Sequence, residues 1–183
     1  MSKTNVTLNI TILGEKNVGK SKLIDDYCKV QKVNPKKKQN KDYISVIKTI
    51  GKVEWNLNLY EFSEIKERKK EISNHHCVII MFDMTSRQAF EDVLDKWITY
   101  LRQINYNNAI ILFGTNNYND NDALPMTDKE EVESLLQKAT KNGIFHYIGD
   151  KTTEEKNELI DKLIEETYSQ TSNNKNNKDC IIF

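Results

Sequence analysis

Residues 14–21 read G-E-K-N-V-G-K-S, and this stretch constrains the fold of the chain more than any other. It fits the pattern G-x-x-x-x-G-K-[ST], in which the two glycines let the backbone wrap closely around a phosphate group. Successive N–H groups then point inward at the N-terminus of a helix, where an anion is stabilised. The pattern indicates phosphate binding when it lies between a strand and a helix. Residues 6–13 alternate apolar and polar as a strand does, and residues 20–30 have an apolar helical face, so the context is present.

The positions of this loop have different expected roles. Lys20 would reach the β- and γ-phosphates of a nucleotide, and the Ser21 hydroxyl would bind Mg²⁺. Lys16 lies beside the phosphates, where it would add positive charge, or else it is a solvated loop lysine. The candidate phosphate-binding residues are Gly14, Glu15, Lys16, Asn17, Val18, Gly19, Lys20 and Ser21.

Strand-like and helix-like segments alternate along the rest of the chain. The short connection at residues 51–52 predicts an antiparallel hairpin, and the continuous apolar run C-V-I-I-M-F suits a central strand buried on both faces. The expected strands cover residues 6–13, 43–50, 53–62, 77–82, 109–113 and 144–148. The expected helices cover residues 20–30, a long segment opened by a capping box of Thr85 and Gln88, residues 128–141, and a last segment from about residue 153.

This order predicts one α/β domain over residues 1–170. Its sheet is expected to be mostly parallel and six-stranded, with one antiparallel edge strand and with helices on both faces. Ligands of such sheets bind outside the carboxyl ends of the strands. Residues 171–183 begin with an Asn- and Ser-rich stretch that has no apolar period, which predicts a flexible tail.

The segment "VIIMFDMTSRQAFEDVLDKWITYLRQ…NAIILFGT" resembles the fourth strand, third helix and fifth strand of small GTPases of the Ras superfamily. The phosphate loop agrees with the same family, and "DKTTEEKNELIDKLIEE" is similar to its last loop and helix. The resemblance covers roughly residues 7–168. It implies a P-loop NTPase fold of the G-domain type, binding of GTP or GDP with Mg²⁺, and effector and regulator proteins as partners.

The switch positions of this chain depart from the family pattern. In the family, a Thr in the first switch senses Mg²⁺ and the γ-phosphate, and the corresponding position in this chain is Gln39. Glu61 takes the place of the Asp in D-x-x-G and keeps a carboxylate for Mg²⁺, whereas Glu64 replaces the glycine and would repel a phosphate. The Gln that orients the attacking water falls on Ile65, unless the alignment shifts in the charged segment that follows. No catalytic residue is therefore assigned, and GTP hydrolysis is expected to be weak or altered.

The guanine-recognition motif [NT]-K-x-D fits residues 113–120, F-G-T-N-N-Y-N-D, in two registers. With Thr115 first, Tyr118 replaces the Asp and guanine selectivity is lost. With Asn117 first, Asp120 is retained and Tyr118 replaces the Lys, with its ring available to cover the base. We favour the second register, although an Asn-rich surface loop is an alternative. The family's last motif, S-A-K, falls on Gly149, Asp150 and Lys151, which complete the candidate base-binding residues.

The chain ends Cys180-Ile181-Ile182-Phe183, which fits the prenylation signal C-a-a-X, and a terminal Phe favours geranylgeranyl. This implies a prenyltransferase as a partner and Cys180 as the lipidated residue; an apolar tail that packs on the domain is the alternative. One prenyl group anchors a protein only modestly, and Lys175 and Lys178 add a thin basic patch. We expect reversible, peripheral association with the cytoplasmic face of a membrane.

Composition excludes several classes of protein. The 27 Lys and Arg balance the 27 Asp and Glu, which argues against a nucleic-acid binder. No apolar stretch approaches the roughly 20 residues that span a bilayer, and the polar N-terminus is unlike a signal peptide. The three cysteines lack the spacing of a disulfide framework, which indicates a reducing compartment. These features favour a cytoplasmic monomer.

Three functions fit these observations. The first is a membrane-associated GTP-binding switch for signalling or trafficking, with altered hydrolysis. The second is a pseudo-GTPase that serves as a membrane-tethered interaction module. The third, a P-loop kinase or ATPase, is disfavoured because the chain has no arginine-rich lid segment.

Overall fold

The computed structural model describes residues 4–32, 36–37, 43–50, 52–64, 69–115, 130, 134, 143–147, 154–155, 157–158, 160–162, 164–165 and 168. Its elements in chain order are β1 (Thr4–Leu13), α1 (Lys20–Val30), β2 (Lys36–Lys37), β3 (Tyr43–Ile50), β4 (Val53–Phe62), α2 (Lys69–Ile72), β5 (Cys77–Asp83), α3 (Arg87–Asp92), η1 (Val93–Ile98), α4 (Thr99–Gln103), β6 (Ala109–Thr115) and β7 (Gly143–Tyr147). Near the C-terminus, the described positions from 154 to 168 are helical.

The strands form one sheet in the order β2-β3-β4-β1-β5-β6-β7. All neighbours from β4 to β7 pair in parallel, whereas β3 is antiparallel to β4 and the two-residue β2 is antiparallel to β3. The α/β architecture predicted from the sequence is therefore confirmed. One detail differs: the six predicted strands did not include β2 (Lys36–Lys37), which pairs with β3, so the antiparallel strand β3 is not the outermost strand.

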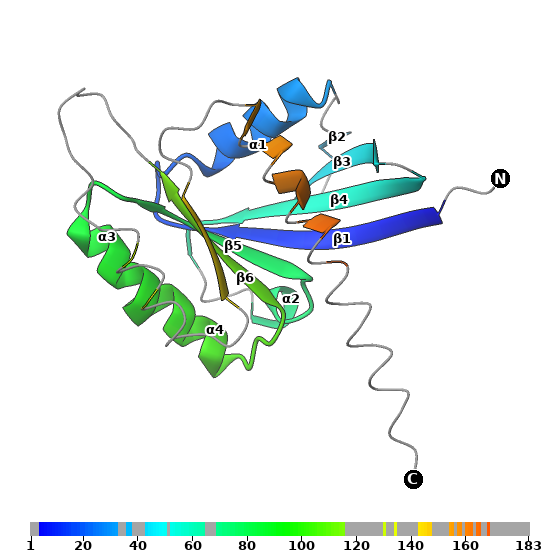
Figure 1. The fold of residues 1–183 in the computed structure, drawn as a ribbon. Helices are drawn as coiled ribbons and strands as arrows, with labels where there is room; N and C mark the ends of the chain where they lie inside the picture. Colours follow the sequence, from blue (N-terminus) through cyan, green and yellow to red (C-terminus); the bar gives the residue numbers. More distant parts are fainter. Residues whose placement is uncertain are drawn as a thin grey trace, which may run out of the picture.

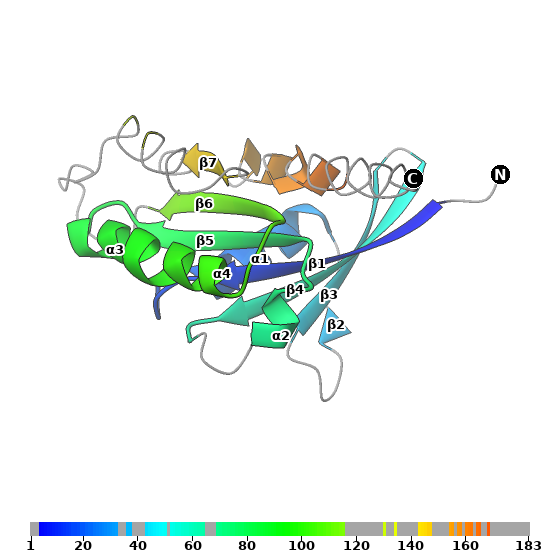
Figure 2. The same ribbon diagram turned by 90° about the horizontal axis from the view of Figure 1, so that it is seen from below.

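Two hydrophobic cores, one on each face of the sheet, explain the continuous apolar strands. Along β5, Cys77, Ile79 and Met81 pack with α1, while Val78, Ile80 and Phe82 pack with the third helix, the continuous helical stretch of α3, η1 and α4. Figures 1 and 2 show these layers, with α1 on one face and the α3–α4 helix on the other. A strand buried on both faces cannot alternate with polar residues, which is why β5 and β6 read as unbroken apolar runs.

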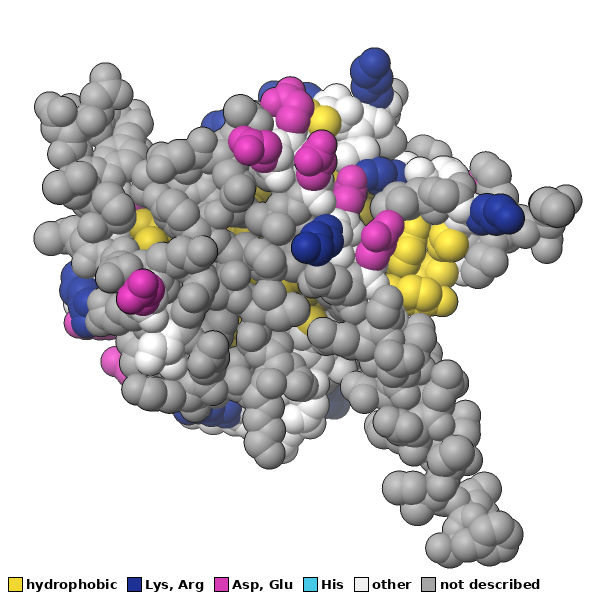
Figure 3. Space-filling view, in the orientation of Figure 1, with side chains coloured by type: hydrophobic (Ala, Val, Ile, Leu, Met, Phe, Trp, Pro, Cys, Tyr) yellow, Lys and Arg dark blue, Asp and Glu magenta, His cyan; other side chains and the backbone are white. Residues whose placement is uncertain are grey.

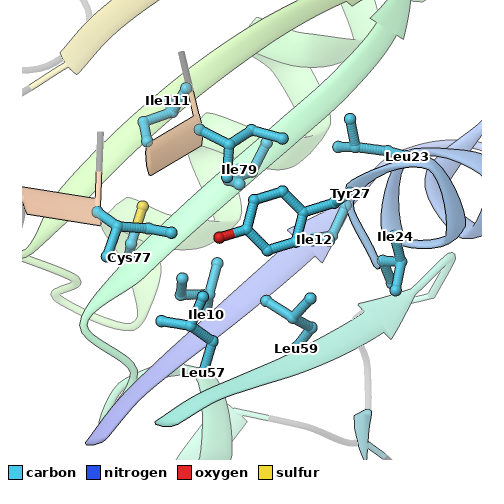
Figure 4. A pocket seen from close by; sticks show the side chains of 12 residues that line it. Ile10, Ile12, Leu23, Ile24, Tyr27, Leu57, Leu59, Cys77, Ile79 and Ile111 are labelled. Atoms are coloured by element: carbon cyan, nitrogen blue, oxygen red, sulfur yellow. The ribbon is translucent and has the colours of Figure 1, made fainter. Parts of the chain in front are cut away.

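The core beneath α1 contains a small cavity of about 30 Å³ (Figure 4). Its walls are apolar, because the Tyr27 hydroxyl donates a hydrogen bond to Asp161 Oδ1 over 2.8 Å. Such a cavity holds one or two waters at most and offers them few partners. It contains no residue of the phosphate loop, so we regard it as imperfect packing. Its lining residues are Ile10, Ile12, Leu23, Ile24, Tyr27, Leu57, Leu59, Cys77, Ile79, Ile111, Ile160 and Ile164.

The third helix differs in two ways from the sequence prediction. The predicted capping box of Thr85 and Gln88 is wrong: the N-cap is Ser86, whose Oγ accepts a hydrogen bond from the Ala89 N–H over 3.2 Å. Thr85 is not the cap because its hydroxyl and N–H both donate to the Asp83 carboxylate, in a local Asx turn. In its middle, the helix widens into the π-helical segment η1.

The other predicted elements are reproduced closely. The observed β3, β4 and α1 have the predicted bounds, and β7 begins and ends one residue earlier than expected. Cys28 and Cys77 are buried and form no disulfide. The predicted helix at residues 128–141 lies outside the described residues except for positions 130 and 134, which are helical. The C-terminal tail, residues 171–183, lies outside them as well.

His75, just before β5, is a buried polar side chain with 2% exposure. Its ring shares a hydrogen bond with the Thr11 hydroxyl and lies 4.2 Å from the ring centroid of Tyr60. Burial, with a smaller contribution from His76, lowers the pKa of His75 to about 4. This environment favours the neutral ring, so His75 serves the core and is not placed as a metal ligand.

We predict that the protein loses stability on acidification because of His75. Its folded pKa of about 4 lies below the unfolded value of about 6.5, so the unfolded chain binds a proton that the folded chain excludes between these pH values. Its contribution is complete above pH ~6.5 and falls by roughly 3 kcal/mol on reaching pH ~4. Urea denaturation of the wild type and of His75→Phe, which keeps a ring against Tyr60, checks this. Equal pH slopes for the two proteins would contradict it.

Candidate functional site

The phosphate loop follows β1 at the carboxyl edge of the sheet and leads directly into α1. Gly14 and Gly19 have φ angles of +151° and +98°, and Asn17 has φ +65°, so the loop uses left-handed conformations at three positions. Packing also requires glycine at position 14, because a Cβ on Gly14 would lie 2.5 Å from the Met81 carbonyl oxygen. The loop therefore fits under the end of β5 only without a side chain at that position.

Lys20, the first residue of α1, is buried at 3% exposure inside the loop. Its ammonium donates hydrogen bonds to the carbonyl oxygens of Gly14, over 3.0 Å, and Glu15, over 2.8 Å. Burial lowers the pKa of Lys20, and the nearby carboxylates of Glu61 and Glu15 oppose that shift. The chain thus holds a cation at the centre of a loop whose backbone curves around it.

Ser21 and Glu61 meet beside the loop on the β4 side. The Ser21 hydroxyl lies 2.8 Å from Glu61 Oε1 and 2.9 Å from Oε2. The parallel pairing of Ile12 with Glu61 and of Leu13 with Phe62 brings the end of β4 to the start of the loop. Both groups are oxygen donors, the ligand type that Mg²⁺ prefers, so their chemistry fits that ion.

The β5 and β6 side of the loop is held by Thr115. Its hydroxyl lies 3.1 Å from the carbonyl oxygen of Phe82 and 3.5 Å from that of Val18. An open pocket of about 260 Å³ lies between the loop and the third helix. The residues that line it are Glu15, Lys16, Asn17, Val18, Met81, Phe82, Asp83, Ala89 and Trp97.

A contact that the sequence analysis missed joins the loop to the third helix. The Glu15 carboxylate forms an ion pair with the Lys96 ammonium of η1. Each side chain is 46% exposed, so the pair lies at the rim of the pocket. The two residues are 81 positions apart, and no local pattern in the sequence connects them.

All but one of the other predicted site residues lie outside the described part of the chain. The switch positions Gln39 and Ile65, the candidate base-binding residues and Cys180 lie outside the described residues, while Glu64 is described and exposed. The base-binding residues concerned are Asn117, Tyr118, Asp120, Gly149, Asp150 and Lys151. The structure therefore brings together the loop, Ser21 and Glu61, and leaves the base-recognition assignment a prediction.

Two features are absent from the described part of the chain. Within it, no group of three or more His, Cys, Asp or Glu side chains is arranged to hold a metal ion. A separate finding concerns membranes: none of its helices combines the length and apolar character needed to cross a bilayer.

Comparison with known proteins agrees with the geometry. Residues 9–171 match the model of the Ras family. The chain is also similar to the Ras-related protein RabV of Dictyostelium discoideum, with 29% identity over 128 residues. This alignment covers 61% of the present chain and 50% of the relative, so the chain spans about half the length of the curated protein that it matches.

The geometry of the loop predicts that replacing its two glycines by alanine destabilises the protein to different extents. Gly14→Ala combines a left-handed φ with a clash against the Met81 carbonyl, whereas Gly19→Ala has only the unfavourable φ, with its nearest contact, Met81 Cε, at 4.0 Å. We expect the free energy of unfolding to fall by about 3 kcal/mol for Gly14→Ala and by about 1 kcal/mol for Gly19→Ala. Urea denaturation of both variants measures this. Equal losses of unfolding free energy in the two variants would contradict the prediction that the close approach of the loop to β5 excludes a side chain at Gly14.

Proposed function

The chain belongs to the Ras family, and from this premise we propose that it is a small GTP-binding protein whose phosphate loop holds GTP or GDP. The observation that carries the proposal is the loop itself, with buried Lys20 at its centre and left-handed residues around it. Such a loop supplies inward N–H groups, a helix N-terminus and a lysine, which together bind a polyphosphate.

In this proposal Ser21 and Glu61 hold Mg²⁺. Their oxygens lie together beside the loop, and a glutamate reaches one methylene further than the aspartate usual at this position. The ion would neutralise phosphate charge. The guanine base would be recognised by Asn117, Tyr118 and Asp120, with the backbone and side chains of residues 149–151 beside it.

Hydrolysis is proposed to be weak or altered. Ile65 has no polar group to orient an attacking water, and a carboxylate at Glu64 would repel the γ-phosphate. The same two residues favour a second candidate function, a pseudo-GTPase that serves as a membrane-tethered interaction module. Measurement of GTP turnover and of nucleotide affinity separates the two: a switch binds GTP and GDP with Mg²⁺, whereas the module binds nucleotide constitutively or not at all.

We predict that Lys20→Ala strongly weakens nucleotide binding. Nucleotide-stripped protein would be titrated with GTP, GDP and ATP, each with and without Mg²⁺, using calorimetry. The wild type should bind the guanine nucleotides in a Mg²⁺-dependent way, and Lys20→Ala should weaken binding at least a hundredfold because a buried, charge-assisted contact is lost. Lys22→Ala is the matched control, since Lys22 lies on the same helix but pairs with Asp26 over 2.9 Å at the surface. Equal affinities for the two variants would refute the assignment of Lys20.

The tail is proposed to attach the protein to a membrane through a prenyl group on Cys180. One such group gives reversible anchoring, which suits a protein that exchanges between membrane and cytosol and meets effectors and regulators at the membrane. Figure 3 shows acidic side chains over α1 and the C-terminal described residues. Exposed acidic residues there outnumber exposed lysines: they are Asp25, Glu154, Glu155, Glu158 and Glu165, against Lys22, Lys29 and Lys162. An anionic lipid surface would repel this excess of negative charge. This face is therefore proposed to turn away from the membrane.

Cys180→Ser should remove membrane association. In cells, the wild type should incorporate labelled geranylgeranyl and divide between the membrane and soluble fractions, whereas Cys180→Ser should be soluble and unlabelled because serine has no thiol to alkylate. Cys28→Ser is the control for loss of a thiol, since Cys28 is buried in the core. An unlabelled wild type, or a labelled Cys180→Ser protein, would overturn the assignment.

A further inference from the structure

We infer that Lys96 is a positioning residue of the phosphate site, which holds the Glu15 side chain and neutralises its charge. The inference rests on the proposed nucleotide binding, and it adds a residue from the third helix to a site otherwise built from the loop, α1 and β4. The observation behind it is the ion pair between the Glu15 carboxylate and the Lys96 ammonium.

Glu15 has two roles in the loop. Its carbonyl oxygen accepts a hydrogen bond from the Lys20 ammonium over 2.8 Å, so its backbone sets the position of the central cation. Its carboxylate is tied to Lys96. A side chain fixed at one end to the third helix therefore limits where the carbonyl that receives Lys20 can lie.

The π-helical segment η1 sets the position of Lys96. At its end the Thr99 N–H reaches back to the Leu94 carbonyl, five residues earlier, and the Thr99 hydroxyl reaches the same oxygen over 3.0 Å. Such a widened turn changes which residues face the loop, and π-bulges are frequent at functional sites. The neighbouring Trp97 is 1% exposed and lines the pocket beside Glu15.

The Trp97 ring also orients the lysine. The Lys96 ammonium lies 4.6 Å from the centroid of the ring, within the range of a cation–π contact. Because Trp97 is anchored in the core beneath the third helix, the ammonium is held between a fixed ring and the Glu15 carboxylate. Lys96 therefore has fewer positions open to it than an ordinary surface lysine.

The position of Lys96 matters because Glu15 is negatively charged. A carboxylate in the loop repels an arriving polyphosphate unless a neighbouring cation neutralises that carboxylate. Lys20 interacts with both Glu15 and Glu61, so it is shared between two carboxylates. Lys96 supplies a separate cation for Glu15 and leaves Lys20 free to meet the phosphates.

A double-mutant cycle separates this role from that of an ordinary surface ion pair. The affinity of a fluorescent GDP analogue would be measured for the wild type, Lys96→Met, Glu15→Gln and the double variant. Lys96→Met should weaken binding roughly three- to fivefold at low salt, since the pair is half exposed. Adding Glu15→Gln should restore the affinity because the unneutralised carboxylate is gone, and Lys96→Arg should behave as the wild type. Lys22→Met, which breaks a surface pair on α1, should have no effect.

Amide hydrogen exchange gives a second measurement that needs no nucleotide. In the nucleotide-free protein, Lys96→Met should speed exchange of the loop amides at residues 18–20 several-fold, and Lys96→Arg should restore protection. Unchanged affinity and unchanged exchange in Lys96→Met would overturn the inference while leaving the proposed function intact. A wild type without nucleotide affinity would refute the proposed function, and the exchange data alone would then decide whether Lys96 positions the loop.

Discussion

The parallel pairing of β1 with β4 on one side and β5 on the other is the constraint on which the rest of the structure depends. It aligns Leu13 with Phe62 and with Ile80, so the phosphate loop begins between two neighbouring strand ends. Glu61 then reaches the loop from β4, and the Met81 carbonyl limits it from β5. If β1 shifted in register, Ser21 and Glu61 would separate and the space that requires Gly14 would change.

The two hydrophobic cores make this register hard to change. Side chains of β5 point alternately to the α1 face and to the third-helix face, so a shift of one residue would exchange every side chain between the two cores. Trp97 and Phe90 are matched in shape to one face, and Tyr27 and Ile24 to the other. The positions of the loop and of Glu61 are therefore maintained by packing: Val18 of the loop belongs to the core on the α1 face, and Glu61 lies between two buried neighbours on β4, Tyr60 and Phe62.

The sequence predicted the elements with strong local signals and missed those set by distant contacts. Alternating or unbroken apolar runs gave the strands, and the glycine pattern gave the loop. The capping error arose because Thr85 and Ser86 are both good caps, and only the Asp83 carboxylate, which takes up Thr85, decides between them. The pairing of Glu15 with Lys96 and the π-helical turn that supports it leave no periodic signal, since they depend on how the third helix packs against the loop.

The balance of charge around the loop bears on how a nucleotide would bind. Three cations lie around the loop, Lys16, Lys20 and Lys96, and three carboxylates match them, Glu15, Glu61 and Asp83, before any phosphate arrives. The net charge of these side chains therefore gives a polyphosphate little long-range attraction, and its binding must rely on direct contact with Lys20, on the inward N–H groups and on the dipole of α1. A divalent cation at Ser21 and Glu61 would change this balance most, because it neutralises Glu61 and bridges to phosphate oxygens. In a site with this composition, we expect nucleotide affinity to follow the Mg²⁺ concentration more steeply than it follows monovalent salt.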